Sequence, residues 1–268
     1  MSFAPILPFS GTVGWKFLQR TQDRQQEVFE KSPMLQRNAD AFRAGIGSIG
    51  SAKDLVENRQ LLEVALGAFG LSEDINNRAL IEKVLTSDTS DPKSLASRFS
   101  DKRYLALAQA FGFGDTDGAR TGEAGFADRI VEPYLGRSFE IAVGEQDQTM
   151  RLALGLEREL ASLAEQEKLS ENGQWYAVMA SPPLRSVFEK ALALPTSVGA
   201  LDIDQQLGIF KDRAQRYFGT SKVADFATPE KMDELRNRFL LRSDLETSTM
   251  SSSVPGSIAL SLLTFGQA

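Results

Sequence analysis

The sequence predicts an all-α, multihelical protein with an internal duplication of helix pairs and a long central helix. Apolar residues recur at the spacing of helices along nearly the whole chain of 268 residues. No segment shows the strict alternation of β-branched and polar residues that is typical of strands. Serine, aspartate, proline and glycine stand where helices would begin or end.

The first seventy or so residues are expected to form helices that end at proline or glycine. A helix is expected over 13–31, and Ser32-Pro33 ends it because the residue before proline disfavours helical backbone. The glycine-rich segment 45–51 is expected to be a turn-rich connector. An apolar stripe follows and ends at Gly70.

Capping residues mark the next two expected helices. Ser72 is an expected N-cap because Glu73 and Asp74 would place negative charge in the first turn. Asp91-Pro92 is expected to open another helix, as a capping residue followed by proline at the first helical position. The residues expected to face inward here are Leu80, Ile81, Val84, Leu85, Leu95 and Phe99.

Two segments of this half repeat one pattern. Ala-Phe-Gly stands at 68–70 and again at 110–112, and each copy ends a Leu/Ala-rich segment that follows an arginine, Arg59 or Arg103. Both glycines are expected to be left-handed C-caps, with the next apolar residue folded back on the last turn. A duplication of helix pairs would also produce the repeat, but two copies are too few to predict a solenoid.

The rest of the chain is expected to continue as helices. Residues 13–245 are expected to form a single all-helical domain whose two subdomains meet near a glycine-rich loop at 112–125. A long helix is expected over 126–169, with a kink at Pro133. Three further helices are expected: one opened by Ser181-Pro182-Pro183, one from Ile203 to Phe218 that ends at Gly219, and one from Thr228-Pro229.

Both ends of the chain differ from its charged centre. Residues 1–12 are expected to be a flexible segment, and the C-terminal tail, 246–268, carries no charged side chain after Glu246. Within that tail 247–256 is expected to be flexible, and the apolar stretch 258–265 is expected to dock on the body or on a partner. The start lacks the basic region of a secretory signal peptide, so a cytoplasmic location is expected.

The composition excludes several classes of function. The chain has no Cys and no His, which removes disulfides, thiol nucleophiles, imidazole bases and Cys/His zinc sites. The net charge of −6 opposes binding to nucleic acid or to an anionic membrane surface. No window reaches the 18 or more apolar residues of a membrane-spanning helix, so no membrane insertion is expected.

The motifs that could carry chemistry fail on spacing. The glycines of 112–118 follow GxGxxxG after an expected helix, which is not the phosphate-binding pattern. Asp115 and Asp117 resemble part of a calcium loop, but the other ligand positions hold Phe113 and Ala124. The acidic pairs Glu157 with Glu165 and Asp202 with Asp204 are expected to be exposed. The sequence therefore indicates no catalytic, cofactor-binding or metal-ligating residue and no cofactor, and it leaves the partner-binding residues unknown.

Several stretches together resemble the DUF1217 family of alphaproteobacterial proteins. The resemblance covers most of 11–245, and no single stretch of it would be specific. The stretches are GWKFLQRTQDRQQEVFEKSP (14–33), DLVENRQLLEVALGAFGLSEDINNRALIEKVL (54–85), DPKSLASRFSDKRYLALAQAFGFG (91–114), FEIAVGEQDQTMRLALGLERELASLA (139–164), PPLRSVFEKALALP (182–195), GALDIDQQL (199–207) and RYFG (216–219). The resemblance implies an all-helical fold with an internal duplication and an association with flagellar gene clusters, and it implies no catalytic residues.

The sequence therefore favours a non-enzymatic structural, assembly or accessory protein of flagellar biogenesis that acts through contacts with other proteins. Its expected partners are flagellar components, and export through the flagellar apparatus would fit the charge-free N-terminus. Two alternatives stay open: a cytoplasmic binding or regulatory module, and an enzyme that uses carboxylates or a bound metal.

Overall fold

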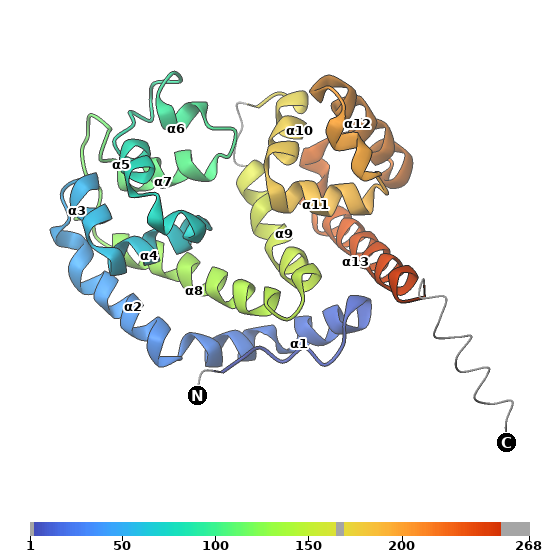
Figure 1. Cartoon of the computed structure of the whole chain (residues 1–268), viewed down its shortest axis with the longest axis horizontal. Coiled ribbons are helices and arrows are strands. Elements are labelled where there is room, and N and C mark those ends of the chain that lie inside the picture. The colour runs from blue at the N-terminus through green and yellow to red at the C-terminus, as the bar shows by residue number, and fades with distance from the viewer. Residues whose placement is uncertain (1–2, 165–168, 253–268) are drawn as a thin grey trace, which may run out of the picture. The chain divides into compact units, whose positions relative to one another are not determined.

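The computed structural model describes residues 3–164 and 169–252, with side chains to 246, and within those ranges it is helical without strands (Figure 1). The all-α prediction is confirmed. The α-helices are α1 (Gly11–Glu30), α2 (Pro33–Gly45), α3 (Ala52–Glu57), α4 (Arg59–Phe69), α5 (Arg78–Leu85), α6 (Leu95–Arg98), α7 (Arg103–Phe111), α8 (Phe126–Gly144), α9 (Gln148–Ala164), α10 (Glu171–Ala180), α11 (Pro182–Ala191), α12 (Ile203–Phe218) and α13 (Pro229–Ser252). Four short 3₁₀ helices are η1 (Ile46–Ser48), η2 (Ser72–Asn76), η3 (Thr196–Ala200) and η4 (Val223–Ala227).

The described residues form two compact units. Unit 1 contains 3–6 and 19–146, and unit 2 contains 7–18 and the described residues after 146. Helix α1 therefore begins in unit 2 and ends in unit 1. The loop 112–125 lies inside unit 1, and the chain divides after Gln146 instead of at that loop.

The prediction of one long helix over 126–169 is wrong in its extent. Helix α8 continues through Pro133 but ends at Gly144, and α9 begins at Gln148. The break has a local cause at Asp147, whose Oδ1 accepts the N–H groups of Thr149 at 2.8 Å and Met150 at 3.1 Å. A carboxylate in this position satisfies the first free N–H groups of a helix, so it starts α9 as a separate element.

Unit 1 is built around α4, whose residues are buried on almost every side. The helix ends at Gly70, which has a φ of 71°. There the N–H of Leu71 donates to the carbonyl of Leu66 at 2.8 Å, a Schellman cap with Leu71 buried. Helix α7 ends in the simpler left-handed cap at Gly112, where φ is 66°. Both glycine C-caps predicted from the repeat are confirmed, and their duplication stays a prediction.

Two expected N-caps are wrong. Ser72 lies inside the 3₁₀ helix η2, and α5 begins only at Arg78. The carboxylate of Asp91 accepts the N–H of Lys93 at 2.8 Å and forms a turn, since aspartate competes for backbone donors two residues ahead. Helix α6 is capped by Ser94, and this late start leaves Leu95 40% exposed while Ala96 is buried.

Unit 2 has an aromatic interior. Trp175 on α10 is fully buried, and its ring meets those of Phe188 on α11 and Phe210 on α12 edge to face at 5.3 and 6.0 Å. Phe226 continues the series against Phe188 and Phe218 at 5.1 and 5.2 Å. The helices expected after Ser181, before Gly219 and after Thr228 are all present, and most of their apolar residues are buried, although Ile203 is 46% exposed.

The N-terminal segment is held by side chains, although the sequence predicts that it is flexible. The Oε1 atom of Gln25 accepts the N–H of Ile6 at 2.6 Å, and its Nε2 donates to the carbonyl of Ile6 at 3.3 Å. The side chain of Gln146 donates to the carbonyl of Pro5 at 2.6 Å. An extended segment that pairs with no strand needs other partners for its backbone N–H and C=O groups, and these two glutamine side chains supply them.

At the other end, helix α13 continues to Ser252, so residues 247–252 are helical where the sequence predicts a flexible stretch. The apolar stretch 258–265 lies outside the described residues. Among the described helices, none combines the length and the apolar character needed to cross a membrane.

Candidate functional site

A hollow of about 530 Å³ opens on the surface of unit 1 where the ends of α4 and α7 meet the start of α8. Its volume lies within the range of about 300–1,000 Å³ that is typical of ligand pockets. The apolar part of its lining consists of Ala68, Phe69, Ala110, Ala119, Phe126, Ile130 and Pro133.

The charged residues at this hollow are largely neutralised within the chain. Arg129 forms an ion pair with Glu123 at 2.6 Å, and its guanidinium lies 5.7 Å from the centroid of the Phe126 ring. Arg120 pairs with Asp115 at 3.3 Å. Pairing removes most of the attraction that either arginine would exert on a small anion, so the apolar lining is what the hollow offers to a ligand.

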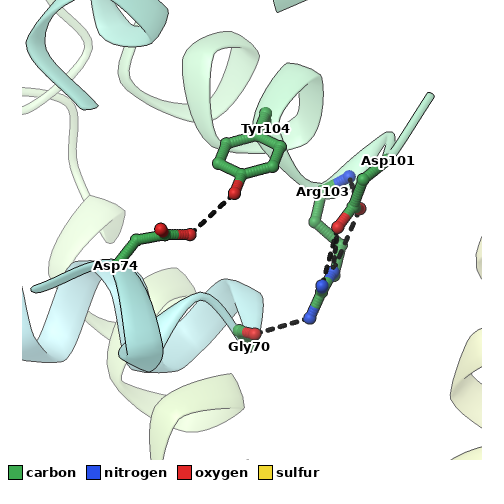
Figure 2. A network of polar contacts seen from close by, with 5 residues as sticks. All are labelled: Gly70, Asp74, Asp101, Arg103 and Tyr104. Atoms are coloured by element: carbon green, nitrogen blue, oxygen red, sulfur yellow. Dashed lines mark hydrogen bonds and ion pairs between the residues drawn. The ribbon is translucent and has the colours of Figure 1, made fainter. Parts of the chain in front are cut away.

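A polar network fixes the end of α4 that lines the hollow (Figure 2). The guanidinium of Arg103 binds both carboxylate oxygens of Asp101 at 2.6 and 3.0 Å, and its Nη1 donates to the carbonyl of Gly70 at 2.5 Å. The hydroxyl of Tyr104 donates to Asp74 at 2.6 Å. Burial, together with this hydrogen bond, raises the pKa of Tyr104 to about 12. The network ties the start of α7 to the end of α4.

The glycine-rich loop 112–125 is held in place by hydrogen bonds and an ion pair of Asp115. The carboxylate of Asp115 accepts the backbone N–H and the hydroxyl of Thr89 at 2.9 and 2.8 Å in addition to its pairing with Arg120. Asp117 is exposed at the rim of the hollow. The loop is therefore tied to the segment after α5 through Asp115.

The acidic pairs considered from the sequence are not brought together as a site. Asp202 caps α12 by accepting the N–H of Asp204 at 2.9 Å, and Asp204 accepts the hydroxyl of Tyr176 at 2.5 Å. Glu165 lies outside the described residues, so its pairing with Glu157 is not described. Among the described residues no group of three or more acidic side chains is arranged to hold a metal ion.

Sequence reasoning did not identify the hollow, because its residues come from separate segments. One signal could have found part of it. The two Ala-Phe-Gly copies supply Ala68 and Phe69 from the first and Ala110 from the second, and these three residues line the same hollow. The repeat thus marks helix ends that lie side by side.

Comparison with known proteins places this fold in a family. The crystal structure of protein AGR_C_984 from Agrobacterium tumefaciens, a structural genomics target, is 25% identical and superposes with a TM-score of 0.71, covering 91% of this chain and 99% of that one. A search of curated proteins found no match. The sequence model of DUF1217, described as a protein of unknown function, matches residues 68–232. Because this match spans more than half of the sequence and includes the entire lining of the hollow, the chain belongs to the DUF1217 family.

Proposed function

We propose that this DUF1217 protein is a non-enzymatic binding protein that accepts a large apolar side chain of a partner protein in the hollow of unit 1. The observation that carries the proposal is the lining itself: seven apolar residues, beside two arginines that are each paired within the chain. Burying one large apolar side chain in such a place contributes about 1.5–3 kcal/mol.

Apart from Asp117, which is exposed at the rim, the carboxylates in and near the hollow already have structural partners. Asp115 and Glu123 are paired with arginines, Asp101 is bound by Arg103, and Asp74 accepts the hydroxyl of Tyr104. A catalytic acid or base must be able to exchange a proton with a substrate, and these groups hold the fold instead. Their use in the fold supports binding over catalysis as the role of this surface.

The partner class in this proposal is a flagellar component. It rests on the resemblance to DUF1217 proteins, which implies an association with flagellar gene clusters. A role in assembly, as an accessory protein, would require contacts of the kind that the hollow offers.

The hollow can be tested by filling it. Ala110→Phe places a ring into the space, whereas Ala106→Phe places the same ring one turn earlier on α7 at an exposed position that does not line the hollow. Both variants should keep the helical circular dichroism of the parent. We expect Ala110→Phe to lose the proteins that co-purify with the wild type from the source strain and Ala106→Phe to retain them. Retention of every partner by Ala110→Phe would show that the hollow is not the binding site.

The flagellar assignment needs its own test. A deletion strain should swim poorly and assemble fewer filaments, and the Ala106→Phe gene should restore both while the Ala110→Phe gene should not. Normal swimming and normal filaments in the deletion strain would remove the flagellar partner class without deciding whether the hollow binds another protein.

A further inference from the structure

Unit 2 carries a cluster of arginines around one tyrosine. The guanidinium of Arg238 on α13 lies over the ring of Tyr217 on α12, 3.9 Å from its centroid, and Arg213 donates to the hydroxyl of the same tyrosine at 3.1 Å. Arg216 is close enough for its charge to act on Tyr217 as well. Arg242 follows Arg238 by one turn of α13, on the same side of the helix.

These four arginines form no ion pair with a carboxylate of the described residues, although the chain has more acidic than basic side chains. Neighbouring basic residues of unit 2 are paired, as in Arg185 with Glu189, Lys190 with Glu246, Lys231 with Glu234 and Arg236 with Asp233. Like charges one turn apart repel each other, so the cluster is unfavourable unless something else supplies negative charge.

Exposed leucines continue the same side of α13. Leu241 is 53% exposed and Leu245 is 58% exposed, and both lie at helical spacing from Arg238. Leu245 and Arg242 also line a second hollow of about 360 Å³. Its other lining residues are Ala193, Leu194 and Pro195 after α11 and the charged residues Glu189, Lys190 and Glu246, which are paired within the chain. The two exposed leucines and the apolar residues of the hollow thus lie next to Arg238 and Arg242, so that this surface offers both apolar contact and positive charge.

We propose that this basic and apolar face of unit 2, comprising Arg213, Arg216, Arg238, Leu241, Arg242 and Leu245, binds an acidic amphipathic segment of a partner protein. Its carboxylates pair with the arginines, and its apolar residues pack on the two leucines and into the second hollow. Electrostatic complementarity selects the partner, and apolar contact supplies the binding that charge alone does not give in water. The inference goes beyond the function proposed for unit 1, because it uses other residues and predicts the chemistry of the bound segment.

A protein segment fits this face better than a nucleic acid does. A polyanion of high charge density is repelled by the net charge of −6, whereas a short segment with a few carboxylates meets mainly the local arginines. An acidic helix with leucines on one side supplies both kinds of contact.

The test uses a labelled synthetic peptide of about 18 residues, long enough to form a helix on binding. The peptide carries leucines along one side and glutamates elsewhere, and its binding to the full chain is followed by fluorescence anisotropy. We expect the double variant Arg216→Glu with Arg242→Glu to weaken binding about tenfold or more. Leu245→Ser should weaken binding as well, and higher salt should weaken it for the wild type.

Matched controls separate this face from general charge. Arg37→Glu with Arg78→Glu makes the same change in net charge at exposed positions of unit 1, and it should leave the peptide affinity unchanged. A peptide with alanine in place of leucine, and a single-stranded oligonucleotide of equal charge, should both bind more weakly. Equal binding of either probe, or equal loss in the unit 1 control, would overturn the proposal.

The chain's own C-terminal tail is the remaining competitor for this face. The full-length variant Leu262→Ser with Phe265→Ser should bind the acidic peptide as the wild type does. A gain of about tenfold in the affinity of this variant for the peptide would show that the tail covers the face. That result would overturn the assignment of the face to a partner protein.

Discussion

Two tyrosines, one in each compact unit, lie in opposite electrostatic surroundings. Tyr104 in unit 1 donates to the carboxylate of Asp74, and its pKa is raised to about 12 by burial and by that acceptor. Tyr217 in unit 2 accepts a hydrogen bond from Arg213, and this bond, with the charges of Arg213, Arg216 and Arg238, lowers its pKa below the usual value.

The contrast shows how differently the surroundings of these two tyrosines use their charges. In unit 1 the charged groups near Tyr104 are paired with each other. The guanidinium of Arg103 binds the carboxylate of Asp101 and also donates to the carbonyl of Gly70, the C-cap of α4. In unit 2 the arginines near Tyr217 have no carboxylate partner among the described residues. Arg238 also donates to the carbonyl of Ala191 at 2.7 Å, a contact that places the arginine without neutralising its charge. The positive charge of the cluster is therefore available for binding.

The unmatched cluster of unit 2 does not reflect loose packing, and Trp175→Ala tests this. Trp175 is fully buried against two phenylalanine rings, so its truncation should cost about 3–5 kcal/mol in urea unfolding followed by circular dichroism. Trp175→Phe keeps a ring but loses the hydrogen bond from Nε1 to the Ser221 carbonyl, and it should cost less. A cost below about 1 kcal/mol for Trp175→Ala would mean that the interior of unit 2 is poorly packed.

The next largest effect separates a paired arginine from an unpaired one. Arg103→Ala removes the guanidinium from the Asp101 carboxylate, which keeps only the backbone N–H of residue 103, and from the Gly70 carbonyl. The change should cost about 2 kcal/mol of unfolding free energy. Arg242→Ala removes an arginine that has no ion pair among the described residues, so the change should stay within about 0.5 kcal/mol. Equal losses of unfolding free energy for the two variants in urea would contradict the distinction between the paired arginine of unit 1 and the unpaired arginine of unit 2.

Much of the fold could be predicted from the sequence, because periodicity and capping residues act locally. Gly70 and Gly112 end helices as expected, and the helices after Ser181 and Thr228 begin where proline permits. The failures occur where two local signals compete. Asp147 could stand inside a helix, but its carboxylate caps a new one. Asp91 could cap a helix, but it closes a turn with Lys93.

The sites were harder to predict, because they depend on which helix ends meet. In the sequence Ala110 has no feature that separates it from other helical residues, and only its position beside Phe69 in the fold makes it part of a hollow. Arg238 and Tyr217 belong to different helices, and nothing in either sequence segment predicts that the guanidinium lies over the ring. Tertiary placement therefore decides the candidate sites even where secondary structure is predictable.

A pH titration gives a smaller effect with a definite sign. The pKa of Tyr104 is higher in the folded protein than the usual value of 10.0, so the unfolded chain loses this proton first as the pH rises. The stabilising contribution of Tyr104 should be complete below pH 10 and should disappear as the pH passes through about 12. Tyr134 and Tyr176 also have raised pKa values, so the difference between the phenolate absorbance titrations of the wild type and of Tyr104→Phe is needed to isolate this group. That difference should show one tyrosine that titrates near the upper value, and a difference centred near pH 10 would contradict the shift.

The smallest effect concerns Tyr217 and tests the field of the arginine cluster directly. Arg213→Gln removes the positive charge beside the hydroxyl, so the pKa of Tyr217 should rise toward its usual value, and Arg216→Gln should produce a smaller rise. The difference between the absorbance titrations of each variant and its Tyr217→Phe partner isolates this one group. Added salt should reduce the difference, since the pair is exposed and its charges are screened. The acidic peptide should raise the same pKa by bringing carboxylates to the cluster. If it binds without changing the titration of Tyr217, its carboxylates do not reach these arginines and it lies on another surface.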